Sequence, residues 1–146
     1  MPETLKIDGK MNVHIISPIR TVLDGVADKI LLPTCNGDMM ILKNRAPLFI
    51  ATRPGLMWVY NAGQRPQAFY ISGGVVELRR NICSVLAWGV DANKVDKVKI
   101  HERRLNLEEE LGKIHSDAQR SQVQERIEFF KMLETKPSLL VPPNFE

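Results

Sequence analysis

Glycine is distributed very unevenly along this chain of 146 residues, and this restricts the folds that the chain can adopt. Eight of the nine glycines precede residue 91, and only Gly112 follows it. Glycine supplies the backbone conformations of tight turns and is unfavourable inside helices. We therefore expect a part rich in turns up to about residue 90 and a helical part after it.

Short apolar runs rich in Val and Ile alternate with turn signals in the first part of the chain. The clearest runs are residues 13–16, 29–32, 39–42, 56–60, 68–71, 75–78 and 82–87, and the breaks include Asp24-Gly25, Asn36-Gly37, Pro54-Gly55 and Ser72-Gly73-Gly74. No segment between the runs is long or periodic enough to be a crossover helix, which favours antiparallel neighbours. We predict an antiparallel β-sandwich of about ten short strands over residues 11–90.

The hydrophobic period changes after Val90 to the spacing of three and four residues that marks one face of a helix. Two such sets follow one another out of phase: Ile100, Leu107, Leu111, Ile114 and Ala118, and then Val123, Ile127, Phe130 and Leu133. Ser116 followed by Gln119 has the form of a capping box, which would start a second helix. We predict an antiparallel helical hairpin over residues 91–136, with helices at about 96–114 and 117–135.

Both ends of the chain are predicted to lie outside these two parts. Residues 1–10 carry Glu3 and Asp8 and have no apolar core, so we expect a polar leader rather than a secretory signal or a transit peptide. Pro137 would end the second helix, and Pro142-Pro143 indicate a flexible tail over residues 137–146.

Composition excludes several classes of function. The formal net charge of +3 is small for a nucleic-acid-binding protein, so we expect no nucleic acid as a partner. No run approaches the roughly 18 apolar residues of a membrane-spanning helix. Cys35 and Cys83 form no metal-binding pattern, and a reducing compartment is the default for such a chain.

The side chains that carry catalysis do not converge in the sequence. The chain has no GxGxxG or phosphate-binding loop, and Ser72-Gly73-Gly74 is interpreted as a tight hairpin that needs positive φ at glycine. His14, His101 and His115 are scattered without the spacing of a zinc site, and the carboxylates of residues 108–110 would fan out around a helix. We therefore predict no catalytic residues and no metal site, and a chain that binds, transmits or regulates.

Five aromatic residues are predicted to lie in strands rather than to be interleaved with basic side chains. Their alternation with aliphatic neighbours indicates core or edge positions rather than a stacking surface for bases. They are Trp58, Tyr60, Phe69, Tyr70 and Trp88. An alternative function that fits these patterns is a stand-alone β-sandwich binding module that dimerises through its helical hairpin, and an enzyme with an unrecognised site is a third.

Seven fragments between Val13 and Trp88 occur in a specific order. They are Ile16-Ser17-Pro18, Leu23-Asp24-Gly25, Asp28-Lys29-Ile30-Leu31-Leu32-Pro33, Gly37-Asp38, Ala46-Pro47-Leu48, Pro54-Gly55 and Ile71-Ser72-Gly73-Gly74-Val75-Val76-Glu77. In this order, and followed by a charged helix pair, they resemble the epsilon subunit of the rotary proton-translocating ATP synthase, which is called delta in mitochondria.

The resemblance implies a non-catalytic subunit of the central stalk of the rotor. Such a subunit couples rotation of the c-subunit ring through the gamma subunit to ATP synthesis, and it lies at the cytoplasmic face of the bacterial inner membrane as a peripheral protein. In this family the helical hairpin folds onto the sandwich or extends toward the alpha/beta hexamer, where it restrains ATP hydrolysis. The implied partners are therefore the gamma subunit, the c-ring and, transiently, the alpha/beta hexamer.

Carried over position by position, the resemblance implies that residues 36–47 face the c-ring and the gamma subunit. The expected contact residues are Gly37, Asp38, Lys43, Asn44, Arg45, Ala46 and Pro47. The family usually has Gly-His before Ala-Pro, whereas this chain has Lys43-Asn44-Arg45, so a basic loop replaces one that carries histidine. This departure suggests a differently tuned partner surface.

Some members of the family bind regulatory ATP between the two helices through an Asp-x-x-Arg-Ala segment. The matching positions here run from Asp96 to Ile100, with Lys99 in place of Arg. Lysine can still oppose a phosphate charge but lacks the bidentate fork of arginine. Asp96 and Lys99 are thus the candidates for a regulatory ATP site, and no other cofactor is expected.

Overall fold

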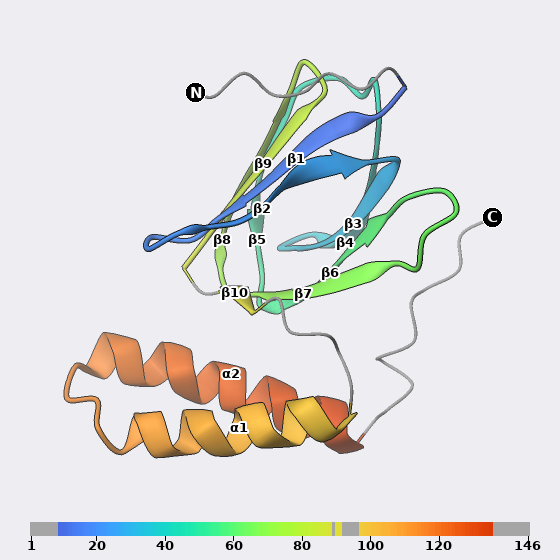
Figure 1. The fold of residues 1–146 in the computed structure, drawn as a ribbon. Coiled ribbons are helices and arrows are strands. Elements are labelled where there is room, and N and C mark those ends of the chain that lie inside the picture. The colour runs from blue at the N-terminus through green and yellow to red at the C-terminus, as the bar shows by residue number, and fades with distance from the viewer. Residues whose placement is uncertain (1–8, 89, 92–96, 136–146) are drawn as a thin grey trace. The chain divides into compact units, whose positions relative to one another are not determined.

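The chain forms two parts that differ in secondary structure. The structure, a computed structural model, describes residues 9–88, 90–91 and 97–135. Contacts divide the chain into two compact units, Met1–Ala92 and Asn93–Glu146. The described part of the first unit holds ten strands and that of the second holds two helices, as shown in Figure 1. Most of the predicted leader and all of the predicted tail lie outside the described residues.

The ten strands are short, as the spacing of the apolar runs predicts. They are β1 (Met11–Ile16), β2 (Thr21–Ala27), β3 (Lys29–Thr34), β4 (Gly37–Leu42), β5 (Leu48–Thr52), β6 (Gly55–Tyr60), β7 (Gln67–Ile71), β8 (Gly74–Arg79), β9 (Ile82–Ala87) and β10 (Val90–Asp91). The β-sandwich and the helix pair after it, predicted from the sequence, are confirmed.

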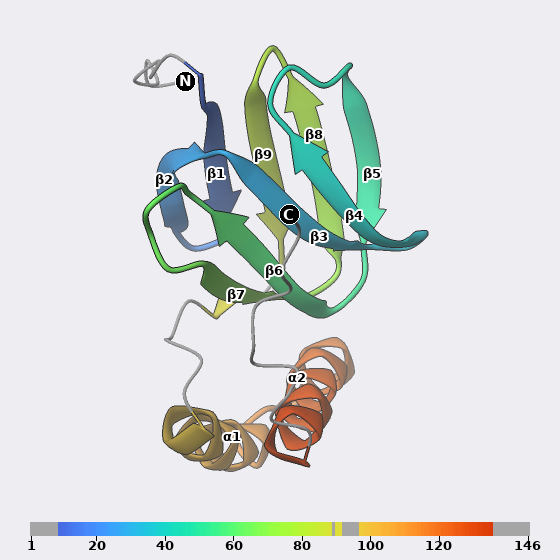
Figure 2. The same ribbon diagram turned by 90° about the vertical axis from the view of Figure 1, so that its right-hand side faces the viewer.

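The strands are arranged in two layers. Hydrogen bonding runs in the order β10-β7-β6-β3-β5-β8-β9-β1-β2, with β4 paired to β3. In Figure 2, one layer, with β3, β4, β6 and β7, lies in front of the other, with β1, β9, β8 and β5. The two layers are joined between β3 and β5 by a single paired position, Thr34 with Thr52. The prediction of antiparallel pairing holds for every described pair except β1 with β9, which run parallel and belong to different antiparallel pairs, β1 with β2 and β8 with β9.

The core lies between the two layers and is built by alternation along the strands. Val13 and Ile15 of β1 and Ile30 and Leu32 of β3 are fully buried, and Val85 of β9 is as well. Burial of an aliphatic side chain of this size contributes about 1.5–3 kcal/mol. The sandwich therefore has a hydrophobic core of its own, made from residues far apart in the sequence.

Two turn predictions in this part of the chain are wrong. Asp24 and Gly25 lie inside β2, where they pair with His14 and Val13 of β1, and β2 is an edge strand, which tolerates such residues. Gly73 and Gly74 have no positive φ and form no hairpin, since β7 and β8 are not paired with each other. Glycine is needed at 74 for space, because a Cβ there would lie 2.8 Å from the Cα of Ala87.

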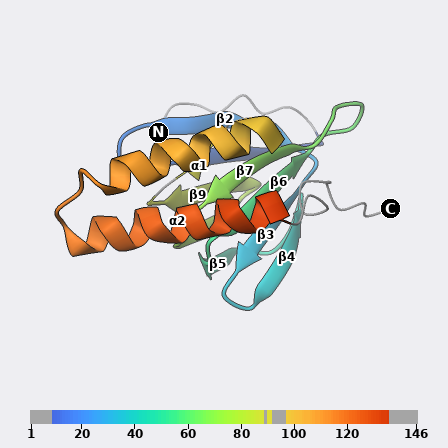
Figure 3. The same ribbon diagram turned by 90° about the horizontal axis from the view of Figure 1, so that it is seen from below.

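Two antiparallel helices make up the described part of the second unit. They are α1 (Lys97–Leu111) and α2 (Asp117–Thr135), which lie side by side in Figure 3. The first helix ends earlier than predicted, directly before Gly112, the residue type that most often follows a helix C-terminus. The second begins directly after Ser116, as the capping pattern predicts. Its buried residues are Ile127, Phe130 and Leu133, all members of the predicted stripe.

Candidate functional site

The basic loop predicted as a contact site connects β4 to β5 at one end of the sandwich. Residues 43–47 of this loop are all exposed. Asn44 has a positive φ of 62°, and its backbone N–H donates to Oδ1 of Asn81, 2.6 Å away, in the turn between β8 and β9. The Arg45 guanidinium donates to the carbonyl oxygen of Met40 at 3.2 Å. The loop is therefore held in place while its charged groups face outward.

The other two predicted contact residues lie elsewhere. Gly37 and Asp38 begin β4, whereas Lys43 follows its last residue, and the strand separates them by about 17 Å at the usual rise per residue. The Asp38 carboxylate accepts a bond from the Arg53 guanidinium at 2.6 Å. The structure thus brings residues 43–47 together but places Gly37 and Asp38 at the opposite end of the strand.

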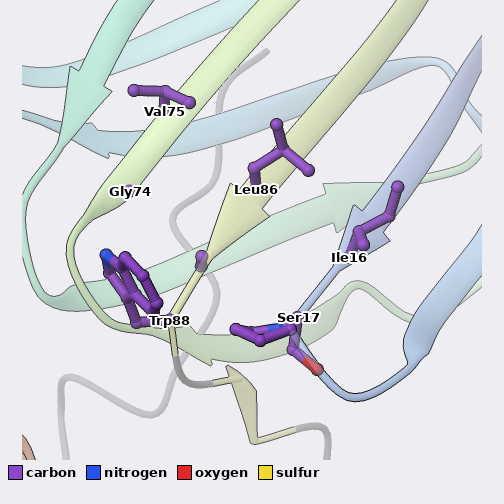
Figure 4. A pocket seen from close by; sticks show the side chains of 8 residues that line it. Ile16, Ser17, Gly74, Val75, Leu86 and Trp88 are labelled. Carbon is purple, nitrogen blue, oxygen red and sulfur yellow. The ribbon is translucent and has the colours of Figure 1, made fainter.

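An apolar groove that the sequence did not reveal lies on the outer face of β1, β8 and β9. Its volume is about 590 Å³, and Figure 4 shows it from close by. Its lining is formed by Ile16, Ser17, Pro18, Gly74, Val75, Leu86, Ala87 and Trp88. Leu86 is 45% exposed, Trp88 is 67% exposed and the neighbouring Ile19 is 89% exposed. Apolar side chains gathered in this way mark interaction sites on soluble domains.

The prediction that the aromatic residues lie in strands at core or edge positions is wrong for Trp88. Trp58, Tyr60, Phe69 and Tyr70 are buried in strands, as predicted. Trp88 instead follows the last residue of β9 and is largely exposed. The exposure of Trp88 could have been predicted from the alternation along β9, because successive side chains of a strand point to opposite faces. This puts Leu86 and Trp88 on the face opposite to the buried Val85 and Ala87.

Ion pairs link the two helices of the hairpin. Glu134 of α2 lies 2.9 Å from Nδ1 of His101 and 2.8 Å from Nε of Arg104, both on α1. Arg104 also binds Glu108 at 2.9 Å, one turn further along α1. Partial burial alone would lower the pKa of Arg104, but its hydrogen bonds to Glu134 and Glu108 outweigh this and raise the pKa. The network fixes the register of one helix on the other.

The predicted nucleotide site is not built up in the described part of the chain. Asp96 lies outside the described residues, and Lys99 lies in the first turn of α1. The regulatory ATP site therefore stays a prediction. Among the described residues, no group of His, Cys, Asp and Glu could hold a metal ion, and no helix is long and apolar enough to span a membrane.

A β-sandwich with a held basic loop and an open apolar groove, followed along the chain by an ion-paired helical hairpin, defines a class of two-part β-plus-α proteins. Residues 10–91 match the family model of the ATP synthase delta/epsilon chain, β-sandwich domain. The chain belongs to the ATP synthase delta/epsilon chain family, as the ordered fragments of the sequence predicted.

Individual relatives support this assignment over most of the chain. The ATP synthase epsilon chain of Nostoc punctiforme is 32% identical over 117 residues, which cover 77% of this chain and 84% of the relative. The epsilon chain of Parvibaculum lavamentivorans is 27% identical over 125 residues, covering 85% and 95%.

Solved structures show the same fold at lower sequence identity. A chain in the Euglena gracilis mitochondrial ATP synthase, in a structure of OSCP, F1 and c-ring, has a TM-score of 0.62 at 18% identity, covering 92% of this chain and 88% of that one. A chain from the central stalk and c-ring of the Tetrahymena thermophila mitochondrial ATP synthase has a TM-score of 0.56 at 15% identity, covering 86% and 96%.

Proposed function

We propose that this chain is a non-catalytic subunit of the ATP synthase central stalk, which couples rotation of the c-ring through the gamma subunit to ATP synthesis. Family membership supports this, and the observation that carries it is the exposed apolar groove that Leu86 and Trp88 help to line. The proposal includes a peripheral position at the cytoplasmic face of the bacterial inner membrane, reached through the complex.

The groove is the surface that we expect the gamma subunit to cover. Its lining is predominantly apolar and includes the exposed side chains of Leu86 and Trp88, and the neighbouring Ile19 is exposed as well. A permanent subunit contact is more hydrophobic than a transient one, which fits a stalk that must carry torque without dissociating. We expect the two ends of β4, with Gly37 and Asp38 at one and residues 43–47 at the other, to contact the ring and gamma separately.

A charge placed in the groove tests this proposal. Leu86→Glu should abolish or strongly weaken co-purification with the gamma subunit of the same organism, because a carboxylate would be desolvated in the contact. Arg65→Glu, a charge change on the exposed loop between β6 and β7, is the matched control and should leave binding unchanged. A Leu86→Glu chain that folds and still binds gamma with the wild-type affinity would refute the docking role of the groove.

We further propose that the hairpin restrains ATP hydrolysis by the complex. The hairpin forms a unit separate from the sandwich, and its helices bury one narrow stripe each, which allows it to exchange one packing surface for another. Truncation after Ala92 keeps every strand of the sandwich, including β10, and should leave a subunit that still assembles. Hydrolysis by the assembled complex should then rise, and unchanged hydrolysis would assign the hairpin a structural role instead.

A dimeric binding module is the second candidate, and two exposed side chains favour it. Leu105 of α1 is 47% exposed and Met132 of α2 is 38% exposed, so the hairpin presents apolar surface to a second copy. Leu107 is fully buried and would be a poor probe, because its replacement would unfold the hairpin. Light scattering should detect a concentration-dependent dimer that Leu105→Glu abolishes; a wild-type monomer at all concentrations would exclude this candidate.

A further inference from the structure

Asn36 is followed by Gly37, and this is the one Asn-Gly pair in the sequence. The two residues lie where β3 turns into β4, at the tip of that hairpin in Figure 2. Both are exposed, and Gly37 has a positive φ of 98°. An asparagine side chain can react with the main-chain nitrogen of the next residue, and glycine obstructs this approach least because it has no Cβ.

The hydrogen bonds of this turn hold its backbone and leave the Asn36 side chain free. The Thr34 hydroxyl accepts from the backbone N–H of Asn36 at 3.2 Å and donates to the carbonyl oxygen of Gly37. Among residues 9–88, 90–91 and 97–135, no group hydrogen-bonds to the Asn36 side-chain amide. A Cβ built on Gly37 would meet no atom within 4 Å, so the side chain has room to turn toward the glycine nitrogen.

The other asparagines in the described part of the chain are more restrained. Asn12 is buried in the strand β1, and Asn106 lies within the helix α1, where the backbone is fixed. The side-chain amides of three more are hydrogen-bonded at 2.9 to 3.0 Å, namely those of Asn44, Asn61 and Asn81. Of the asparagines that the structure describes, Asn36 alone combines an exposed position, a side chain without a hydrogen bond and a glycine after it.

We propose that Asn36 is a site of spontaneous deamidation, at which the β3–β4 turn acquires a carboxylate as the protein ages. The Gly37 nitrogen loses its proton to water and attacks Cγ of Asn36, so that a C–N bond forms and the side-chain nitrogen leaves as ammonia. Water then opens the five-membered imide: attack at Cγ gives aspartate, and attack at the main-chain carbonyl carbon gives isoaspartate. Water is the only co-reactant, and the inference does not depend on the proposed function.

The attacking nitrogen belongs to the last pair of a ladder, so opening of the turn sets the rate. Thr34 and Gly37 form the final pair between β3 and β4. Such an end pair opens at a smaller free-energy cost than pairs inside a sheet. We therefore expect the native chain to deamidate at Asn36 more slowly than an unfolded peptide of the same sequence, and much faster than at the buried Asn12.

Both products change this end of β4. The new carboxylate would lie two positions from Asp38, whose own carboxylate pairs with the Arg53 guanidinium at 2.6 Å. Isoaspartate also adds one carbon to the main chain of a turn that the Thr34 hydroxyl bonds at two points. A lengthened main chain cannot keep both bonds in place, so the isoaspartate form should have a lower melting temperature than the aspartate form.

The test incubates the full chain at pH 8 and follows it by ion-exchange chromatography and peptide mass spectrometry. An acidic species should accumulate, with a mass gain of about 1 Da in the tryptic peptide of residues 30–43, where Asn36 is the only asparagine. Conversion there should be about tenfold faster than at any other asparagine. In the matched variant Asn36→Gln the same attack would need a six-membered ring, so the acidic species should not form, and the melting temperature should stay that of the wild type.

Two further measurements separate the chemistry from the contribution of the fold. A methyltransferase specific for isoaspartate should label the aged wild-type chain and neither the fresh chain nor Asn36→Gln. A synthetic peptide of residues 30–43 should convert faster than the native chain. A native chain that stays unmodified at Asn36 while this peptide converts would overturn the inference, and so would faster conversion at any other asparagine.

Discussion

Gly74 and Ala87 face each other across the β8–β9 pair so closely that a Cβ on Gly74 would lie 2.8 Å from the Cα of Ala87. The same Cβ would collide with the backbone carbonyl of Leu86. The obstacle is main chain on a central strand pair, which cannot move aside without breaking the hydrogen bonds between β8 and β9.

Gly74→Ala should therefore destabilise the sandwich strongly. We expect a loss of about 3 kcal/mol in the free energy of unfolding, at the upper end of what overpacking usually costs. Chemical denaturation followed by tryptophan fluorescence measures it. Gly73→Ala is the control: the nearest atom to its Cβ would be the Thr52 carbonyl oxygen at 3.9 Å, so the loss should stay within about 0.5 kcal/mol. Equal losses in the two variants would contradict the close approach at Gly74.

The two cysteines should differ sharply in reactivity. Cys83 is fully buried in β9, and burial raises the pKa of its thiol to about 12, whereas Cys35 is exposed in the turn between β3 and β4. The thiolate is the reactive form. A thiol reagent at pH 7.5 should modify Cys35 alone in the native protein and both residues in denaturant. Rapid modification of Cys83 in a native Cys35→Ser variant would show that the core opens.

Stability should fall in acid partly through Asp28. The hydrogen bond from the Ala62 N–H, helped by the positive charge of Lys10, holds the pKa of the Asp28 carboxyl below its ordinary value, although partial desolvation opposes this. Because the folded-state pKa is the lower one, the contribution is complete above the unfolded pKa of about 4 and is lost as the pH falls through the folded pKa. Asp28→Asn should lower the free energy of unfolding at pH 7. Between pH 5 and pH 2 the free energy of unfolding of the variant should decline less steeply than that of the wild type. An identical acid profile in the variant would contradict this assignment.

Arg120 should stabilise the end of the first helix from outside it. Its guanidinium, on α2, donates to the carbonyl oxygen of Leu111, the last residue of α1, at 2.9 Å and to that of Ile114, in the following turn, at 3.1 Å. Carbonyl oxygens at a helix C-terminus lack intrahelical donors, so these bonds stabilise the end of α1. Arg120→Met should lower local stability by about 1 kcal/mol, measured as faster amide exchange in the last turn of α1. Lys113→Met, an equal change of charge at an exposed site nearby, should leave this exchange unchanged.

Periodicity predicted the fold well where one face of an element is buried. The runs around Val76 and Val85 alternate because β8 and β9 bury one side, and the stripe through Ile127 and Phe130 follows the helical repeat for the same reason. The runs around Val13 and Ile30 belong to strands that are buried on both faces. The edge strand β2 was missed because Asp24 and Gly25 interrupt its apolar pattern. The parallel pairing of β1 with β9 could not be predicted, since it depends on packing between hairpins rather than on local residue type.

The contact surfaces were harder to predict than the fold. The segment 36–47 was treated as one site, but it contains the whole of β4, which carries Asp38 and Lys43 to opposite ends of the sandwich. The hydrogen bonds between Asn44 and Asn81 join residues that no short sequence window contains together. Surfaces made from separate segments need the tertiary fold before they can be identified.

The parallel pairing of β1 with β9 has a consequence for how this chain is made. A nascent chain leaves the ribosome from its N-terminus, so the hairpin of β1 and β2 is synthesised long before Ile82 to Leu86, the part of β9 that pairs with β1. Until then Val13 and Ile15 have no completed core to enter, and the emerging segment needs protection from aggregation. Once β9 has emerged from the ribosome and paired with β1, the sandwich can complete its fold while the helices are still being translated. Synthesis thus completes the sandwich and its apolar groove before it adds the hairpin.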